Sequence, residues 1–133
     1  MSYLNTGQLN VTNNKYHAHQ QLIKRFSVLL GKELPKARIF GRVTGLFYAK
    51  RKDGYVPTKI NDKGMSDAYI MYDCGACIIY LDCEFKTGQA VQNKYQKQWQ
   101  QYIESMNGFY LIIRDEHQGI KDIRNYLKGL NIL

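Results

Sequence analysis

Residues 76–86 alternate between two chemically different faces, and this alternation constrains the fold more than any other feature of the chain. One face is apolar throughout and consists of Cys77, Ile79, Leu81, Cys83 and Phe85. The other face consists of Ile78, Tyr80, Asp82, Glu84 and Lys86. Because successive side chains of a strand point to opposite sides of the sheet, the segment is predicted to be a β-strand whose apolar face packs against a helix. The polar end of the second face is where we expect a functional site, although a solvated sheet face would show the same alternation.

This strand is predicted to form a hairpin with the segment that precedes it. Residues 67–72 are rich in aromatic and β-branched side chains, and the sequence Asp-Cys-Gly at residues 73–75 is a plausible tight turn. Antiparallel pairing across this turn brings Asp67 opposite the neighbourhood of Asp82 and Glu84. Asp67 and Glu84, seventeen positions apart in the sequence, are thus expected to be cross-strand neighbours.

Hydrophobic periodicity and turn signals predict the remaining elements of a single α/β domain spanning residues 1–133. In chain order they are a flexible lead-in (1–14), a helix (15–30), a strand or strand pair (38–48), a basic turn or loop (49–63), the two hairpin strands, a helix (92–106), a strand (109–113) and a helix (119–130). The predicted order is α-β-β-β-α-β-α. The helix at 92–106 has an apolar stripe, expected to be mostly core, that consists of Tyr95, Trp99, Tyr102, Ile103 and Met106.

The charge of the chain favours a polyanionic partner. The 133 residues carry a net charge of +8 and a sequence pI of about 9.4. Residues 1–63 have twelve Lys and Arg against three acids, a balance of +9, and residues 64–133 have seven against eight, a balance of −1. Clustered bases gain affinity by displacing counterions from phosphates, so nucleic acid is the natural candidate. The alternative is that the positive charge serves only solubility.

The cysteines and the N-terminal segment favour an intracellular protein without a membrane anchor. Cys74 and Cys77 have the spacing of half a zinc site or of a redox pair, but no second Cys or His pair completes a tetrahedral site. Cys77 and Cys83 are therefore predicted to be structural cysteines on the apolar strand face. No segment has the apolar core of a signal peptide or the roughly 18 apolar residues of a membrane-spanning helix.

Four short motifs in the second half of the chain resemble a known family. They are Gly-Met-Ser-Asp at 64–67, Asp-Cys-Glu-Phe-Lys-Thr-Gly at 82–88, Gln-Lys-Gln-Trp at 96–99 and Gly-Phe-Tyr-Leu-Ile-Ile-Arg at 108–114. Their order and spacing resemble the VRR-NUC branch of the PD-(D/E)XK nuclease superfamily. The resemblance implies a restriction-endonuclease-like core, a central mixed β-sheet flanked by helices.

The same resemblance implies roles for individual residues. Asp67, Glu84 and the main-chain carbonyl of Phe85 would bind Mg²⁺ or Mn²⁺, the hard cations that oxygen ligands suit. Lys86 would be the catalytic lysine, and Gln96 on the following helix would support the site. The chemistry implied is hydrolysis of a phosphodiester, in which a metal ion activates water and offsets the developing negative charge.

The first helix departs from the family pattern. Many relatives carry an acid there, whereas this helix contains none and the region holds Gln20, Gln21, His17 and His19, with Glu33 just beyond it. Which of these completes the site stays open. The two histidines are two positions apart and face different directions on a helix, so they are expected to be surface or cap residues and a poor chelating pair.

The resemblance points to a stand-alone, structure-selective DNA endonuclease of a bacterial or phage-infected cell. Small members of this kind include Holliday-junction resolvases, so branched or duplex DNA is the expected substrate and a homodimer the expected assembly. The bases expected to contact DNA are Arg42, Lys50, Arg51, Lys52, Lys59 and Lys63. Two alternatives remain: a non-catalytic DNA-binding module with a decayed nuclease fold, and a restriction-like enzyme, which would need a cluster of base-reading side chains that is not recognisable here.

Overall fold

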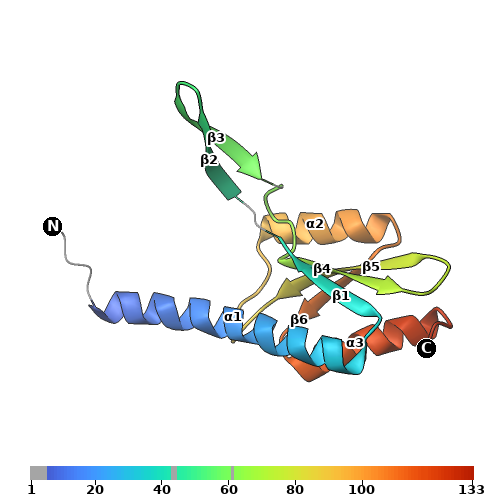
Figure 1. Ribbon diagram of the computed structural model, residues 1–133. Coiled ribbons are helices and arrows are strands. Elements are labelled where there is room, and N and C mark those ends of the chain that lie inside the picture. Colours follow the sequence, from blue (N-terminus) through green and yellow to red (C-terminus); the bar gives the residue numbers. More distant parts are fainter. Residues whose placement is uncertain (1–5, 43–44, 61) are drawn as a thin grey trace.

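A four-stranded mixed sheet forms the centre of the molecule (Figure 1). The computed structural model describes residues 6–42, 45–60 and 62–133, and the side chains of residues 17–42, 50–57 and 62–133. The strands of the sheet are, in spatial order, β1 (Ala37–Gly41), β4 (Ala68–Asp73), β5 (Ile78–Phe85) and β6 (Phe109–Ile113). The first three pair in antiparallel fashion, and β6 is parallel to β5. The expected α/β class with a mixed central sheet is therefore confirmed.

Helices cover both faces of this sheet. α1 (Thr6–Glu33) and α3 (Glu116–Gly129) pack together on one face, and α2 (Lys94–Ser105) lies on the other (Figure 1). α2 makes the crossover that a parallel β5–β6 pair requires. α1 begins nine residues before the predicted start at Lys15, so residues 6–14 of the expected flexible lead-in are helical, while residues 1–5 lie outside the described residues. None of the described helices is long and apolar enough to cross a membrane.

The hydrophobic core lies between the sheet and the α1–α3 pair. Phe26 of α1 and Phe85 of β5 meet edge to face at its centre, with ring centroids 5.5 Å apart, and neither is measurably open to solvent. Leu81 and Cys83 of β5 lie on the same face and are fully buried. The prediction that the apolar face of β5 meets a helix is thus confirmed for these residues. Cys77 is the exception, because it lies before the strand and is exposed.

The turn between β4 and β5 contains a disulfide. Cys74 and Cys77 are bonded to each other, and Gly75 between them adopts a positive φ of 91°. The prediction that Cys77 is a structural free cysteine is therefore wrong, whereas Cys83 is free and buried as expected. Periodicity assigned Cys77 to the strand, but β5 begins at Ile78, two residues later than the alternation from residue 76 suggested.

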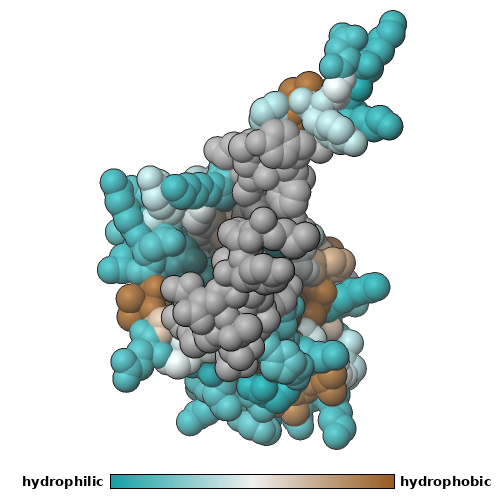
Figure 2. Space-filling view, turned by 90° about the vertical axis from the view of Figure 1, so that its left-hand side faces the viewer, coloured by the Kyte–Doolittle hydropathy of each residue, from teal (hydrophilic) through white to brown (hydrophobic). Residues whose placement is uncertain are grey.

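A second, two-stranded sheet projects from the body of the molecule (Figure 1). It consists of β2 (Gly45–Arg51) and β3 (Gly54–Ile60), whose register places Arg51 opposite Gly54. The prediction of a loop over residues 49–63 is therefore wrong for most of that segment. The predicted order α-β-β-β-α-β-α is wrong as well, because the described residues form five strands between α1 and α2. The Asp53-Gly54 pair is a hairpin signal, and Gly54 has a positive φ of 126° directly after the turn at residues 52–53. The charged residues around it are more typical of a loop, so the strands were not predicted. The tip of the hairpin is hydrophilic (Figure 2).

The apolar stripe of α2 is less buried than predicted. Ile103 is 4% exposed and belongs to the interior, but Tyr102 and Met106 are each more than half exposed and Tyr95 is 39% exposed. α2 covers the sheet with the side that carries Gln96, Trp99 and Ile103, so part of the stripe faces outward. The expectation that this stripe is mostly core is corrected accordingly.

Candidate functional site

The pairing of β4 and β5 brings two carboxylates together. Ala68 pairs with Cys83, so Asp67 and Glu84 lie in the next opposed position, as the turn signal predicted. Asp67 Oδ2 accepts a hydrogen bond of 2.8 Å from the main-chain N–H of Phe85. This bond fixes the Asp67 carboxylate beside the end of β5. Because the N–H and C=O of one strand residue point to the same side, the carbonyl of Phe85 also faces Asp67.

Gln96 of α2 connects the two other predicted site residues. Its amide oxygen accepts a hydrogen bond of 2.9 Å from Lys86 Nζ, and its amide nitrogen donates one of 3.0 Å to Glu84 Oε1. Lys86 Nζ also lies 3.6 Å from Glu84 Oε1 as an ion pair. The structure therefore brings Asp67, Glu84, Lys86 and Gln96 into one cluster.

The N-terminus of α2 holds Gln96 in this position. Asn93 is the N-cap residue, and its side chain accepts a hydrogen bond of 2.9 Å from the Gln96 N–H. In return the Gln96 amide oxygen accepts a 2.9 Å bond from the Asn93 N–H. This reciprocal arrangement is a capping box, which satisfies two N–H groups that a helix end leaves without partners. One side chain thus serves both the start of the helix and the site.

Glu84 is a buried carboxyl group whose hydrogen bonds are incomplete. Its side chain is 3% exposed, and its Oε2 atom is buried without a hydrogen-bond partner. Burial raises the pKa of Glu84 to about 8, and the negative charge of Asp67 adds to the rise, while the charge of Lys86 opposes it. A buried oxygen without a partner is costly unless an ion or water satisfies it. The donor set therefore fits a hard divalent cation, although the described residues contain no cluster of three or more His, Cys, Asp or Glu side chains at ligand spacing.

His19 is the first-helix residue that reaches the site. Its Nε2 atom lies 3.3 Å from Asp67 Oδ2, and its ring meets Phe85 edge to face with centroids 6.4 Å apart. The expectation that both histidines are surface residues is therefore wrong for His19. A signal was present in the sequence, because His19 lies three and seven positions before Leu22 and Phe26 and so shares their buried helix face.

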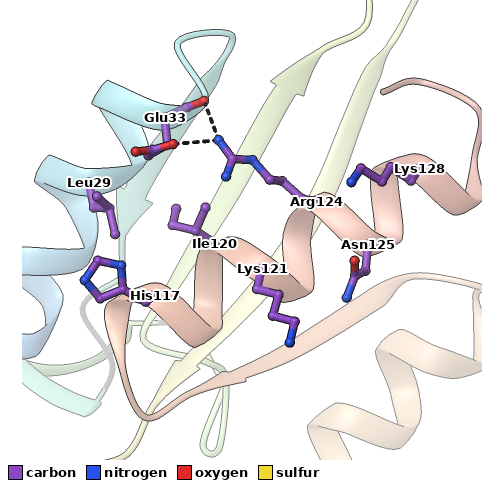
Figure 3. Close-up of a pocket in the computed structure, with 8 residues that line it drawn as sticks. All are labelled: Leu29, Glu33, His117, Ile120, Lys121, Arg124, Asn125 and Lys128. Atoms are coloured by element: carbon purple, nitrogen blue, oxygen red, sulfur yellow. Dashed lines mark hydrogen bonds and ion pairs between the residues drawn. The ribbon is translucent and has the colours of Figure 1, made fainter.

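The other first-helix candidates lie elsewhere. His17 and Gln20 are exposed, and Gln21 is half-buried. Glu33 is at the far end of α1, where its carboxylate pairs with Arg124 Nη2 of α3 at 2.6 Å (Figure 3). That pair lines a pocket between α1 and α3, on the side of the sheet opposite α2.

Arg42 is an internal residue and not a surface contact. Its side chain is 10% exposed, and Nη1 lies 2.8 Å from Asp82 Oδ1, with further bonds to Ser66 and Tyr80. The opposite oxygen of Asp82 accepts a 2.7 Å bond from Trp99 Nε1. The expectation that Arg42 contacts DNA is corrected, because the guanidinium is engaged in neutralising a carboxylate that is completely buried.

The remaining predicted DNA contacts lie on and beside the projecting hairpin. Lys50, Arg51 and Lys52 are exposed at its tip. Lys63, which follows the hairpin, is exposed and its Nζ atom lies 4.1 Å from the ring centroid of Tyr95. Lys59 belongs to β3, but its side chain lies outside the described residues.

Tyr110 is a neighbour of the site that periodicity alone did not identify. It lies on β6 opposite Asp82, is 8% exposed, and its hydroxyl accepts a bond of 3.2 Å from Gln92. Burial raises the pKa of Tyr110 well above its usual range, and the nearby charge of Glu84 adds to the rise. The alternation of β6 could have indicated that Tyr110 shares the face of the acids.

The cluster combines a pair of carboxylates, a lysine that a glutamine orients, and a histidine beside one carboxylate. Such a set can hold a hard cation and place a positive charge next to it. No family model matches the sequence, and a search among curated proteins finds no similar one. The functional interpretation therefore depends on the geometry of the site and on the resemblance of its motifs.

Proposed function

We propose that the protein is a metal-dependent endonuclease that hydrolyses phosphodiester bonds of DNA, built on a restriction-endonuclease-like core. The observation that carries the proposal is the state of Glu84, whose buried Oε2 has no partner while its pKa is raised to about 8 beside Asp67. A structural carboxylate in this position would be expected to have its hydrogen bonds completed. A carboxylate that binds a cation needs no such hydrogen bonds, because the cation takes their place.

The residues that would hold the metal are Asp67, Glu84 and the carbonyl of Phe85. When bound, Mg²⁺ or Mn²⁺ would supply an activated water and positive charge toward the scissile phosphate. Asp67 is oriented for this role by the Phe85 N–H and by His19, which approach the same oxygen at 2.8 Å and 3.3 Å.

Lys86 would provide the second positive charge. Gln96 Oε1 holds its ammonium group at 2.9 Å, and Glu84 Oε1 lies 3.6 Å away, so the group cannot swing freely into solvent. A positive charge that is fixed before the reaction stabilises the charge that develops on the phosphate at little reorganisation cost. Gln96 is then a positioning residue, because it acts on the phosphate only through Lys86 and Glu84.

The substrate would approach from the side of the projecting hairpin. Lys50, Arg51 and Lys52 at its tip are exposed and supply cations away from the body of the molecule. Such an arm can reach a phosphate backbone while the cluster at the end of β5 contacts the bond to be cut. Branched DNA, and a homodimer that presents two sites to it, are the substrate and assembly that we propose on the resemblance of the motifs.

The test is cleavage of labelled four-way junction, flap, linear duplex and single-stranded DNA in EDTA, Mg²⁺ or Mn²⁺. Wild-type protein is compared with Glu84→Gln, and Glu104→Gln serves as the control because Glu104 is an exposed residue of α2 bonded to Gln100. Metal-dependent cutting that Glu84→Gln abolishes and Glu104→Gln retains is the expected result. Tight binding without cutting in any metal would overturn the proposal in favour of a DNA-binding module.

A further inference from the structure

A cleft beside the outer side of α2 has walls that are unusual for a solvent-facing surface. Its volume is about 370 Å³, and the residues that line it are Asp62, Lys63, Tyr95, Gln98, Trp99 and Tyr102. Tyr95 and Tyr102 are 39% and 54% exposed, although large aromatic side chains are ordinarily buried. Aromatic residues grouped on a surface mark a site of binding more often than isolated ones do.

The aromatic walls of the cleft are held in place. Trp99 is anchored by the 2.7 Å bond from its Nε1 atom to the buried carboxylate of Asp82. Tyr102 packs against it with ring centroids 5.5 Å apart and planes inclined by 42°. An aromatic surface whose side chains are fixed in advance loses little entropy when a flat ligand packs against it.

Two lysines lie beside the Tyr95 wall of the cleft, whose lining also includes Asp62. Lys63 Nζ lies 4.1 Å from the centroid of the Tyr95 ring, and Lys94 Nζ lies 5.9 Å from the same ring. Cations beside aromatic faces are the combination with which proteins hold a nucleic-acid strand, because the rings stack on bases while the lysines meet phosphates.

The position of the cleft connects it to the candidate site. Tyr95 and Gln96 are consecutive residues at the start of α2, so the same turn of helix carries a wall of the cleft and the residue that orients Lys86. The segment that carries Lys63 lies directly against this turn. The main chain of Gly64 approaches that of Tyr95 so closely that a Cβ at Gly64 would overlap it. A strand that crosses the N-terminus of α2 would therefore meet both places.

We propose that this cleft is a nucleobase-binding subsite, which takes an unpaired base of the DNA strand that the candidate site cuts. The inference rests on the proposed function, because it assigns the cleft and the site to one strand. The base stacks on Tyr102 and Trp99, and Lys63 and Lys94 pair with the flanking phosphates. A subsite of this kind explains why α2 keeps Tyr95 and Tyr102 on a side that does not pack against the sheet.

Trp99 makes the proposal directly measurable, because it is the only tryptophan of the sequence and lines the cleft. The protein, in EDTA so that no cutting occurs, is titrated with a single-stranded oligothymidylate and with an abasic oligonucleotide of equal length. The expected result is quenching of Trp99 fluorescence by the first and weak or absent quenching by the second. Tyr102→Ala is expected to weaken oligothymidylate binding about tenfold, the effect of losing one stacking contact.

Two further cleft variants and one control make the test specific. Tyr95→Ala and Lys63→Gln, at separate walls of the cleft, are expected to weaken binding of the oligothymidylate, as Tyr102→Ala does. Met106→Ala is the control, because Met106 is an exposed apolar residue of the same helix end but does not line the cleft. Circular dichroism establishes that each variant is folded. Equal quenching by the abasic strand, or unchanged affinity in all three cleft variants, would overturn the proposal.

The subsite and the proposed function fail in different ways. Quenching of Trp99 by the oligothymidylate alone, in a protein that cuts no DNA in any metal, would support the subsite and refute the nuclease. Metal-dependent cutting that Glu84→Gln abolishes, together with equal quenching of Trp99 by the oligothymidylate and the abasic strand, would refute the subsite and support the nuclease.

Discussion

Arg42 Nη1 lies 2.8 Å from Asp82 Oδ1 beneath α2, and the Asp82 side chain is completely buried. Tyr80 donates a further bond of 2.7 Å to the same oxygen, and the ring faces of Tyr69, Tyr80 and Trp99 surround the guanidinium. The pair joins the end of β1 to β5 and α2, so it ties together the elements that carry the candidate site. Burial, together with the hydrogen bond to Asp82, raises the pKa of Tyr80 to about 12, so this hydroxyl keeps its proton throughout the neutral range.

Loss of Arg42 should be severe. Arg42→Met leaves the charge of Asp82 buried without its partner, and removal of one member of a buried pair costs about 3–5 kcal/mol of unfolding free energy. Urea unfolding followed by circular dichroism measures this cost. Arg38→Met is the matched control, because Arg38 lies on β1, which Arg42 directly follows, and has an exposed side chain. It should change stability by less than about 0.5 kcal/mol. Equal effects of the two variants would contradict the structural role of Arg42.

The protonation of Glu84 should make the metal-free protein less stable as the pH rises. The folded protein holds this proton up to a pKa of about 8, whereas the unfolded chain releases it near the usual value of 4.5. Between these two values the folded state binds more protons than the unfolded state, so its stability falls as the pH rises through the window.

Glu84→Gln tests this expectation, because glutamine resembles the protonated acid at every pH. In EDTA the variant should unfold several degrees above the wild type at about pH 9 and close to it at about pH 5. Differential scanning calorimetry gives both midpoints, and Glu104→Gln controls for the loss of a negative charge on the surface. A wild type that is as stable as the variant at the higher pH would contradict the raised pKa of Glu84.

Gly64 should be intolerant of a side chain for two separable reasons. Both Gly64 and Gly75 adopt a positive φ, of 87° and 91°, so alanine is strained at either position by about 1–2 kcal/mol. At Gly64 the added Cβ also overlaps the main chain of Tyr95, whereas at Gly75 it enters open space. Gly64→Ala should therefore destabilise the protein clearly more than Gly75→Ala, and the difference between their unfolding free energies measures the close approach to α2. Equal costs would show that this contact is not tight.

The hairpin tip should control the salt dependence of DNA binding. Substitution of Lys50, Arg51 and Lys52 by Gln removes up to three phosphate contacts. Each contact contributes roughly −0.9 to the slope of log K against log salt concentration, so the slope should become less negative by roughly 2.7. Fluorescence anisotropy at several salt concentrations measures it. Lys121→Gln with Lys128→Gln removes exposed charges of α3 and should leave the slope unchanged. An unaltered slope in the triple variant would remove the hairpin tip from the DNA interface.

Gln96 should matter for the rate of cleavage more than for binding. Gln96→Ala releases Lys86 and Glu84 from their shared partner, and the loss of fixed charge at such a position lowers the rate by about a hundredfold or more. Single-turnover cleavage, with DNA affinity measured in EDTA, separates the two effects. Gln100→Ala is the control, since Gln100 lies one turn later and bonds to the exposed Glu104. A comparable loss in both variants would indicate general damage to α2.

The sequence predicted the part of the candidate site that depends on local rules. The turn residues and the alternation of the two strands set the pairing of β4 with β5, and this pairing places Asp67 opposite Glu84. The same alternation places Lys86 on the strand face of Glu84. Gln96 meets them because the crossover helix of a parallel pair must return over the same sheet. Each of these relationships is encoded within a short stretch of chain.

The parts that the sequence did not predict depend on packing between distant segments. His19 reaches Asp67 only through the way in which α1 docks on the sheet, and the two are 48 positions apart. Nothing in the sequence around Arg42 distinguishes it from a surface base, because its partner Asp82 is 40 positions away. The hairpin was missed for a different reason, since its Asp-Gly turn lies among charges that are typical of loops.

The β2–β3 hairpin leaves the central sheet between β1 and β4, which are direct neighbours. Their pairing continues to the point of departure, where Gly41 lies opposite Ala68 and the Arg42 N–H donates to the Asp67 carbonyl at 2.8 Å. The two ends of the insertion therefore emerge side by side, a geometry that tolerates replacement by a short turn or by a longer arm. If the proposed function holds, an arm of another length or charge in place of the hairpin is expected to change which DNA the protein binds and to leave the candidate site at the end of β5 intact.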